Sequence, residues 1–151
     1  MDSARIVMTG AFLVLLLLLA GRDIQARVIP NRLVYPGAAL ALSAAPLLPA
    51  ESYTSALTGG AVALTLFTLV YLVHPHAIGE GDVKLAALIG LGLGFPDGLT
   101  ALFLGALLGG LAAGAALALR RVRLGSTMAY GPYLCAGAVA VGLLGTSPPW
   151  G

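Results

Sequence analysis

Residues 54–95 decide the fold, and they read TSALTGGAVALTLFTLVYLVHPHAIGEGDVKLAALIGLGLGF. Two apolar segments, Thr54–Val73 and Val83–Phe95, flank a short polar connection. The connection ends in Gly79-Glu80-Gly81-Asp82, so an aspartate stands directly before an apolar run. An ionisable group at membrane depth costs roughly 2.5 to 3.5 kcal/mol on insertion scales, and it therefore indicates a functional site.

The whole chain resembles this stretch in composition. Of its 151 residues, 59% are hydrophobic and 9% are charged, and the mean hydropathy is +0.98. A soluble domain carries about 25% charged residues. We therefore expect one all-α domain, residues 1–151, that crosses a lipid bilayer several times. The net charge of +2 does not indicate nucleic-acid binding.

Four further apolar segments extend the pattern in both directions. Together with the two quoted above they predict about six transmembrane helices, and they lie at Ile6–Ala20, Leu33–Leu48, Leu99–Leu119 and Ala129–Leu144. The second and fourth of the six are shorter than the about 20 residues that cross a bilayer, so we expect flanking residues to extend them or the bilayer to thin. Two alternatives stay open: the first segment also fits a cleaved signal peptide, and the fourth also fits a re-entrant segment.

Several glycines recur at the small-xxx-small spacing. The pairs are Gly90 and Gly94, Gly105 and Gly109, and Gly110 and Gly114. Small residues at this spacing let helix backbones approach closely in lipid. We therefore predict that all three pairs lie at helix contacts.

The basic residues predict the orientation. If six segments alternate, only Arg5 lies on one side of the membrane, and the other side receives Arg22, Arg27, Arg32, Lys84, Arg120, Arg121 and Arg123. The positive-inside rule makes the second side cytoplasmic. Both termini are then expected outside.

A second aspartate, Asp23, follows the first apolar segment and is expected at the same membrane face as Asp82. Two carboxylates about 4 Å apart repel by about 4 kcal/mol at an effective dielectric near 20, which equals about three pKa units. Such a pair shares one proton near neutral pH, so one acid can deprotonate water while the other supports a substrate carbonyl. Asp23 and Asp82 are therefore candidate catalytic residues for peptide hydrolysis, without metal or cofactor.

The residues around Asp82 form a candidate active-site loop. Gly79 and Gly81 permit close approach of an extended peptide because they lack a Cβ. Lys84 is included as a candidate, although the pattern favours a membrane anchor whose ammonium reaches the interface. The sequence does not indicate which residues bind the substrate.

A structural interpretation of the two aspartates is also open. Asp23 would then pair with Arg22 or Arg27, and Asp82 would cap the helix that follows it. His74 and His76 have the spacing of some metal ligands, but no carboxylate or cysteine completes a set, so we expect no metal site.

Another function class fits the same residues. A small proton- or cation-coupled transporter or channel component would use the aspartates for ion binding. It predicts acids along a path across the membrane, whereas Asp2, Glu51 and Asp97 lie toward the outer side. A noncatalytic assembly scaffold is a third alternative.

Four elements in this order resemble the prepilin peptidase family, also called type IV leader peptidases. They are Asp23, Ile29-Pro30-Asn31-Arg32-Leu33, Gly79-Glu80-Gly81-Asp82-Val83-Lys84-Leu85 and Tyr130-Gly131-Pro132-Tyr133-Leu134. The resemblance covers nearly the whole chain and implies the fold of a GxGD intramembrane aspartyl protease. It implies that Asp23 and Asp82 are catalytic and that Gly79 and Gly81 are the motif glycines.

The resemblance also implies a substrate and a location. The substrate would be a prepilin or pseudopilin, with a short basic leader before a hydrophobic N-terminal helix, cut at the cytoplasmic face of the inner membrane. Longer family members carry a segment with paired cysteines and N-methylate the product, whereas the single cysteine here is Cys135. We therefore expect a peptidase without methyltransferase activity, similar to the short enzymes of Flp or tight-adherence pili or to the related archaeal preflagellin peptidases. The oligomeric state is not indicated.

Overall fold

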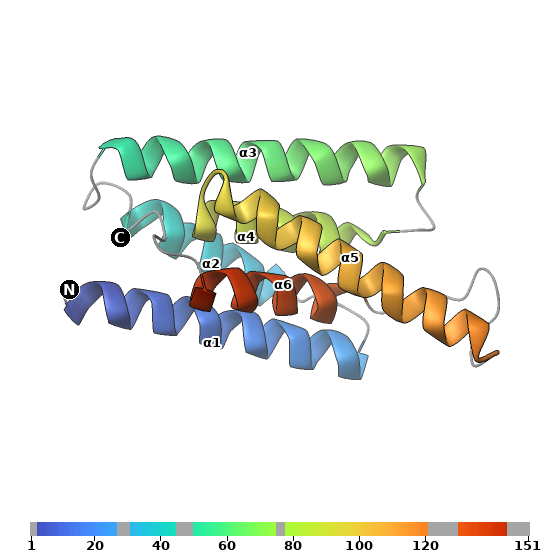
Figure 1. The fold of residues 1–151 in the computed structure, drawn as a ribbon. Coiled ribbons are helices and arrows are strands. Elements are labelled where there is room, and N and C mark those ends of the chain that lie inside the picture. Colours follow the sequence, from blue (N-terminus) through green and yellow to red (C-terminus); the bar gives the residue numbers. More distant parts are fainter. Residues whose placement is uncertain (1–2, 27–30, 45–49, 75–77, 121–129, 145–151) are drawn as a thin grey trace.

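The computed structural model describes residues 3–26, 31–44, 50–74, 78–120 and 130–144. They form helices α1 (Ser3–Ala26), α2 (Asn31–Ala44), α3 (Ala50–Val73), α4 (Glu80–Leu93), α5 (Asp97–Ala118) and α6 (Gly131–Leu144) (Figure 1). Helices satisfy their own backbone hydrogen bonds, which is the requirement that lipid imposes on such apolar segments. No strand occurs within these ranges, so the expected all-α fold is confirmed.

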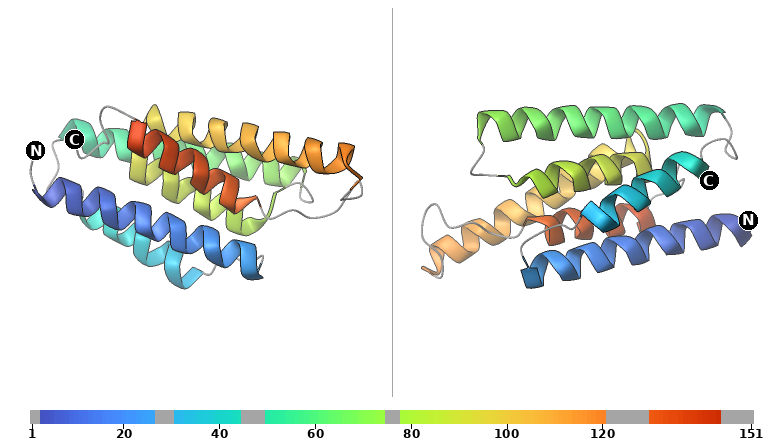
Figure 2. Two further views of the ribbon diagram at one scale, coloured as in Figure 1. Left: turned by 60° about the horizontal axis from the view of Figure 1, so that its bottom comes forward. Right: turned by 180° about the vertical axis from the view of Figure 1, so that it is seen from behind.

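Successive helices alternate in direction along one long axis of the bundle (Figures 1 and 2). One end of the bundle therefore gathers the C-terminal ends of α1, α3 and α5 and the N-terminal ends of α2, α4 and α6. Helix α4 is central, because it packs against α2, α3, α5 and α6. Helices α1 and α3 lie on opposite sides of it. We call the end that holds the start of α4 the α4-start end.

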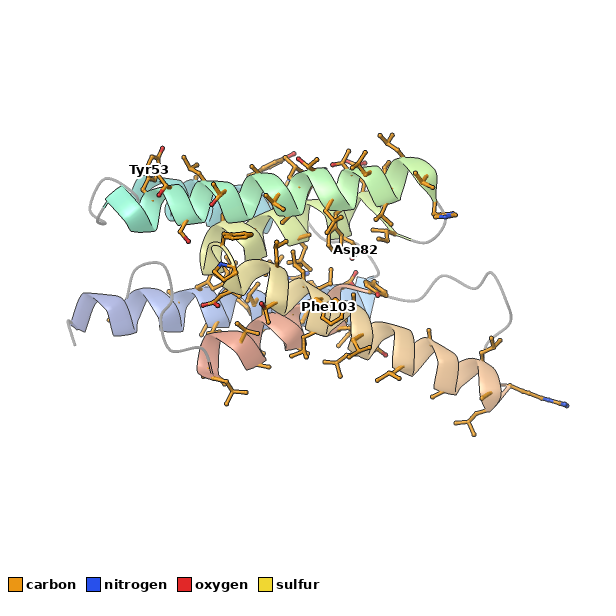
Figure 3. All side chains as sticks on the ribbon, turned by 45° about the horizontal axis from the view of Figure 1, so that its top comes forward. Tyr53, Asp82 and Phe103 are labelled. Carbon is orange, nitrogen blue, oxygen red and sulfur yellow. The ribbon has the colours of Figure 1, made fainter. Side chains whose placement is uncertain are left out.

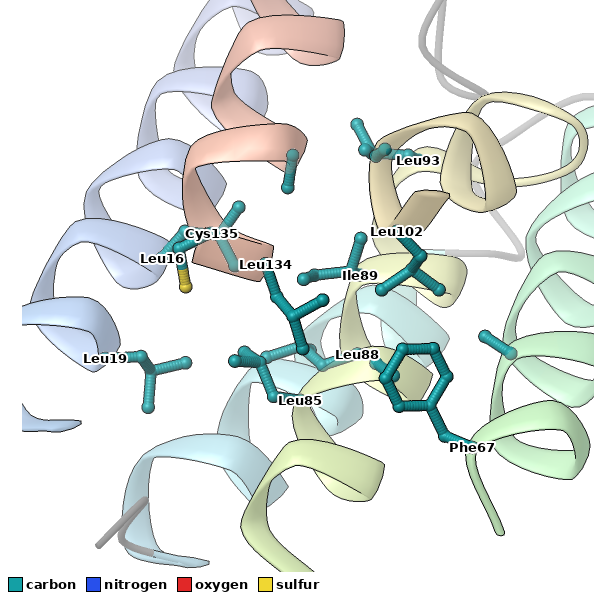
Figure 4. Packing of buried hydrophobic residues seen from close by; sticks show 14 of the residues in the cluster. Leu16, Leu19, Phe67, Leu85, Leu88, Ile89, Leu93, Leu102, Leu134 and Cys135 are labelled. Atoms are coloured by element: carbon teal, nitrogen blue, oxygen red, sulfur yellow. The ribbon is translucent and has the colours of Figure 1, made fainter. Parts of the chain in front are cut away.

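The buried core is built around α4. Leu85, Leu88 and Ile89 recur at helical spacing and have almost no exposed surface. Leu19 of α1 and Leu134 of α6 belong to the same cluster (Figure 4). Close packing supplies the stabilisation here, because lipid is as apolar as leucine and offers little hydrophobic drive between helices.

Glycines allow two helix pairs to touch through their backbones. A Cβ added to Gly59 of α3 would come within 2.5 Å of the Gly90 carbonyl oxygen of α4, and one on Gly105 of α5 within 2.7 Å of Leu134 Cα of α6. The prediction of close packing is thus confirmed for Gly90 and Gly105. It is wrong for Gly110 and Gly114, because a Cβ at either position meets nothing within 4 Å.

The fourth segment differs from its predicted bounds at both ends. Helix α4 starts at Glu80 rather than Val83, and it ends at Leu93 because Gly94 adopts a positive φ of 72°. The following turn is tied to α3: the Phe95 amide donates to the Ser55 carbonyl at 3.0 Å, and Ser55 Oγ donates to the Phe95 carbonyl at 2.9 Å. Because α4 and α5 run in opposite directions, α4 forms a pass of its own through the bundle (Figure 1).

The outer faces of the long helices are apolar. Residues Tyr53–Val73 and Asp97–Ala118 are long and apolar enough to cross a membrane. Leu69 of α3 is 55% exposed and Phe103 of α5 is 70% exposed (Figure 3). Helix α4 has 14 residues and rises only about 21 Å. It does not need a full bilayer length, because four other helices enclose it.

Candidate active site

Asp23 lies in the last turns of α1, because the helix continues past the predicted apolar segment to Ala26. Its side chain is buried, with 5% exposed. Its Oδ2 accepts a hydrogen bond of 3.1 Å from the backbone amide of Gly131, the first residue of α6. The first amides of a helix have no partner within that helix, so the carboxylate satisfies one of them.

Asp82 occupies the first turn of α4 and is 8% exposed. Its Oδ2 accepts a hydrogen bond of 3.1 Å from the amide of Gly79, the residue that caps the helix. A carboxylate three residues after the cap residue is well placed for this bond and for the positive end of the helix dipole. The structural interpretation is therefore correct in one respect, because Asp82 does stabilise the start of its helix.

Asp23 and Asp82 come from different helices whose ends meet at the α4-start end: Asp23 is near the end of α1, and Asp82 is in the first turn of α4 (Figure 1). Among the described residues they are the buried charged groups. Burial raises the pKa of Asp82 to about 6, the Gly79 amide opposes this, and the negative charge of Asp23 adds to it. Burial also raises the pKa of Asp23, against the opposing effect of the Gly131 amide. Among the three contributions to the pKa of Asp82, burial is the largest and the charge of Asp23 is the smallest.

The predicted loop around Asp82 is the start of a helix. Gly79 is its cap residue, with extended backbone angles, and Gly81 lies in the first turn. Lys84 Nζ donates to Glu80 Oε1 at 2.5 Å and lies 6.0 Å from the centre of the Tyr35 ring of α2. This hydrogen bond lowers the pKa of Glu80. Because Lys84 follows Asp82 by two residues, their side chains leave the helix on different faces.

The other sequence candidates lie apart from this pair. Arg22 is exposed, and Asp97 begins α5 at the opposite end of the bundle. Arg27 and His76 lie outside the described residues. Within the part of the chain that the structure describes, no three histidine, cysteine or acidic side chains are grouped as metal ligands.

Sequence reasoning assigned no role to Gly131. The sequence did contain a hint of this role: Gly131 stands directly before Pro132, which has no amide proton to donate, at the start of a helix. The contact could not be read from the sequence, since its two residues are 108 positions apart.

Fold and site thus define a helical membrane protein that buries two acids from different helices at one end of its bundle. The chain belongs to the type IV leader peptidase family, whose pattern matches residues 10–114. The matched range contains both Asp23 and Asp82.

One relative is the prepilin leader peptidase/N-methyltransferase of Bacillus subtilis (strain 168), which is 29% identical over 136 residues. The alignment covers 90% of this chain and 55% of the relative, so the chain spans about half the length of that protein. No solved structure matches the chain.

Proposed function

We propose that this protein is a membrane-embedded aspartic endopeptidase that removes the basic leader from type IV prepilins or pseudopilins. Family membership and the name of the Bacillus relative support the reaction class. One observation carries the assignment of residues: Asp23 and Asp82 are buried at the same end of the bundle, and each accepts a backbone amide hydrogen bond. In the proposed mechanism, these bonds would orient both carboxyl groups toward one substrate.

The chemistry follows from the shared environment of the two acids. Like charges at close range favour a singly protonated pair that titrates as one unit. The ionised acid takes a proton from water, and the resulting hydroxide attacks the scissile carbonyl carbon. The protonated acid donates a hydrogen bond to the carbonyl oxygen, and the amine that leaves takes a proton from the pair. This mechanism needs no group beyond the two carboxyls and water.

The location follows from the arrangement of charge. Arg22, Arg32, Lys84 and Arg120 all lie in the segments that meet at the α4-start end. We propose that this end faces the cytoplasm, in accord with the positive-inside rule, and that both termini face outward. A prepilin would then place its hydrophobic helix in the bilayer beside the bundle and its leader at the cytoplasmic face.

The test is cleavage by the full chain purified in detergent. A prepilin is incubated with the protein, and mass spectrometry of the product identifies the new terminus. Asp23→Asn and Asp82→Asn keep size and a hydrogen-bond acceptor but remove the acid, so each should abolish cleavage. Glu80→Gln, at an exposed acid beside the site, is the matched control and should cleave normally.

Retained cleavage in either aspartate variant would defeat the assignment of the pair. The transporter alternative has a different outcome: liposomes would show proton or cation flux that Asp82→Asn removes, and the prepilin would stay intact.

A further inference from the structure

We propose that Tyr130 is a positioning residue that holds the start of α6 against α5, so that the Gly131 amide meets the carboxylate of Asp23. Its effect on cleavage rests on the proposed function, whereas its effect on the Gly131 hydrogen bond does not. Tyr130 directly precedes α6, and its hydroxyl donates to α5 rather than to either aspartate.

The start of α6 offers Asp23 very few donors. The Tyr130 carbonyl accepts the first helical hydrogen bonds, from the amides of Tyr133 at 3.1 Å and Leu134 at 3.3 Å. Tyr130 is therefore the cap residue, and Gly131 and Pro132 are the first two helical residues. Proline carries no amide proton. Of these two residues only Gly131 can donate, and it donates to Asp23.

The Tyr130 side chain is held against α5. Its hydroxyl donates a hydrogen bond of 3.0 Å to the carbonyl oxygen of Ala106. Its ring fills the space beside Gly109, where an added Cβ would lie 2.8 Å from Cε2 and 3.0 Å from Cζ. Ala106 and Gly109 are three residues apart, which places them on the same face of α5.

Tyr130 and Gly131 are adjacent in the chain, so a displacement of the Tyr130 ring moves the peptide that carries the Gly131 amide. The phenol hydroxyl already donates its hydrogen bond to α5. Tyr130 thus acts through Gly131 and Asp23 rather than on the substrate.

The chain offers a matched pair of variants for the test. Gly109→Ala places a methyl group against the Tyr130 ring, and Gly110→Ala places one in open space on the same helix. Both gain the same helix propensity. We expect Gly109→Ala to lower kcat for prepilin cleavage about tenfold with KM within about twofold, because the ground-state contacts of the substrate are untouched. Gly110→Ala should match the wild type.

Tyr130→Phe provides a second variant that keeps the ring and removes only the hydroxyl. It should lower kcat about threefold to tenfold, the effect of one lost hydrogen bond. If Gly109→Ala does not fold, Tyr130→Phe alone tests the positioning role of Tyr130.

A second measurement follows the amide itself. In protein labelled with ¹⁵N-glycine, Asp23→Asn should move the Gly131 amide proton resonance, Gly109→Ala and Tyr130→Phe should also move it, and Gly110→Ala should leave it in place. In an active enzyme, an unchanged kcat or an unchanged Gly131 resonance in both Tyr130-directed variants would overturn the inference. If the wild type and Gly110→Ala both fail to cleave, the proposed function fails, and the resonance alone decides on the positioning of Gly131.

Discussion

At the scale of the residue, the carboxyl group of Asp82 has two tasks. It accepts the Gly79 amide that starts α4, and it lies close enough to Asp23 for the charge of one to affect the other. The two tasks oppose each other in pKa, because the amide favours the charged form and burial disfavours it. Burial is the larger effect, so the pKa of Asp82 is raised to about 6.

The raised pKa of Asp82 predicts how stability depends on pH. Its pKa is about 6 in the fold, against an ordinary value of 3.8. A raised acid pKa stabilises the fold fully below the ordinary value, and this contribution is lost as pH rises through the folded value. We expect the unfolding free energy to fall by at most about 3 kcal/mol between pH 4 and pH 7. The Tm measured in detergent should fall over the same range.

Asp82→Asn tests this reading, because asparagine still accepts the Gly79 amide but does not titrate. Most of the fall in Tm should disappear in this variant, and Glu80→Gln should retain it. An equal fall in wild type and Asp82→Asn would assign the pH dependence to another group.

For Lys84 we predict only small effects on stability and cleavage. Lys84→Met keeps the apolar stem and removes the ammonium from Glu80 and Tyr35. An ion pair with an exposed partner contributes little, so we expect the unfolding free energy to change by less than about 1 kcal/mol. Prepilin cleavage should stay within about tenfold of the wild-type kcat/KM. A loss as complete as that of Asp82→Asn would instead place the ammonium in the chemistry.

The two acids of the candidate site could be predicted from the sequence, but the groups that bind them could not. Asp23 and Asp82 stand out because acids are costly in an apolar chain, and both are buried, one near the end of α1 and the other at the start of α4. The partners of these acids did not stand out. Both are backbone amides, of Gly79 and Gly131, and a backbone donor leaves no mark in composition.

At the scale of the element, α4 has the most restrictive surroundings. It contacts four other helices, and its backbone touches that of α3 at Gly90 and Gly59. The apolar pattern predicted that this segment is helical. The bounds could not be read from apolar residues alone, because the helix begins with Glu80 and ends where Gly94 takes a positive φ. The role of each glycine was also unreadable, since spacing does not tell which face of α5 has a neighbour.

Gly59→Ala should separate α3 from α4. Its methyl group would lie 2.5 Å from the Gly90 carbonyl oxygen and 2.6 Å from the Gly94 carbonyl carbon. These are backbone atoms, which cannot change rotamer, so we expect a loss of about 1 to 3 kcal/mol. In a thermal unfolding assay this corresponds to roughly 2–4 °C per kcal/mol for a chain of this size.

Gly114→Ala is the control for this prediction. A Cβ there meets nothing within 4 Å, so the same chemical change should leave Tm unchanged or raise it. Equal Tm values for Gly59→Ala and Gly114→Ala would show that the α3–α4 contact is not as close as described.

At the scale of the whole molecule, alternation of the six helices sets which groups share a membrane face. Glu80 and Phe95 stand at the two ends of α4, with side chains 71% and 50% exposed. Our proposed orientation puts Glu80 at the cytoplasmic face and Phe95 at the outer face. The alternation was predictable from six apolar segments, whereas the order of packing around α4 was not, because each segment is apolar on nearly all sides.

Single-cysteine labelling tests this orientation. Cys135 is buried and is replaced by alanine to give a background without thiols. In that background, a membrane-impermeant maleimide should label Phe95→Cys in right-side-out vesicles and Glu80→Cys only in inverted ones. Labelling of both positions from one side would contradict a separate pass for α4.

The hydrogen bond between Asp23 and Gly131 also has a consequence for biogenesis. Its donor lies 108 residues after its acceptor, on the last of the described helices. During translation, both aspartates therefore enter the bilayer well before the amide that orients one of them has left the ribosome. A nascent chain carries its two acids in an unfinished arrangement, and under our proposed function it would become able to hydrolyse a peptide only once α6 has been made.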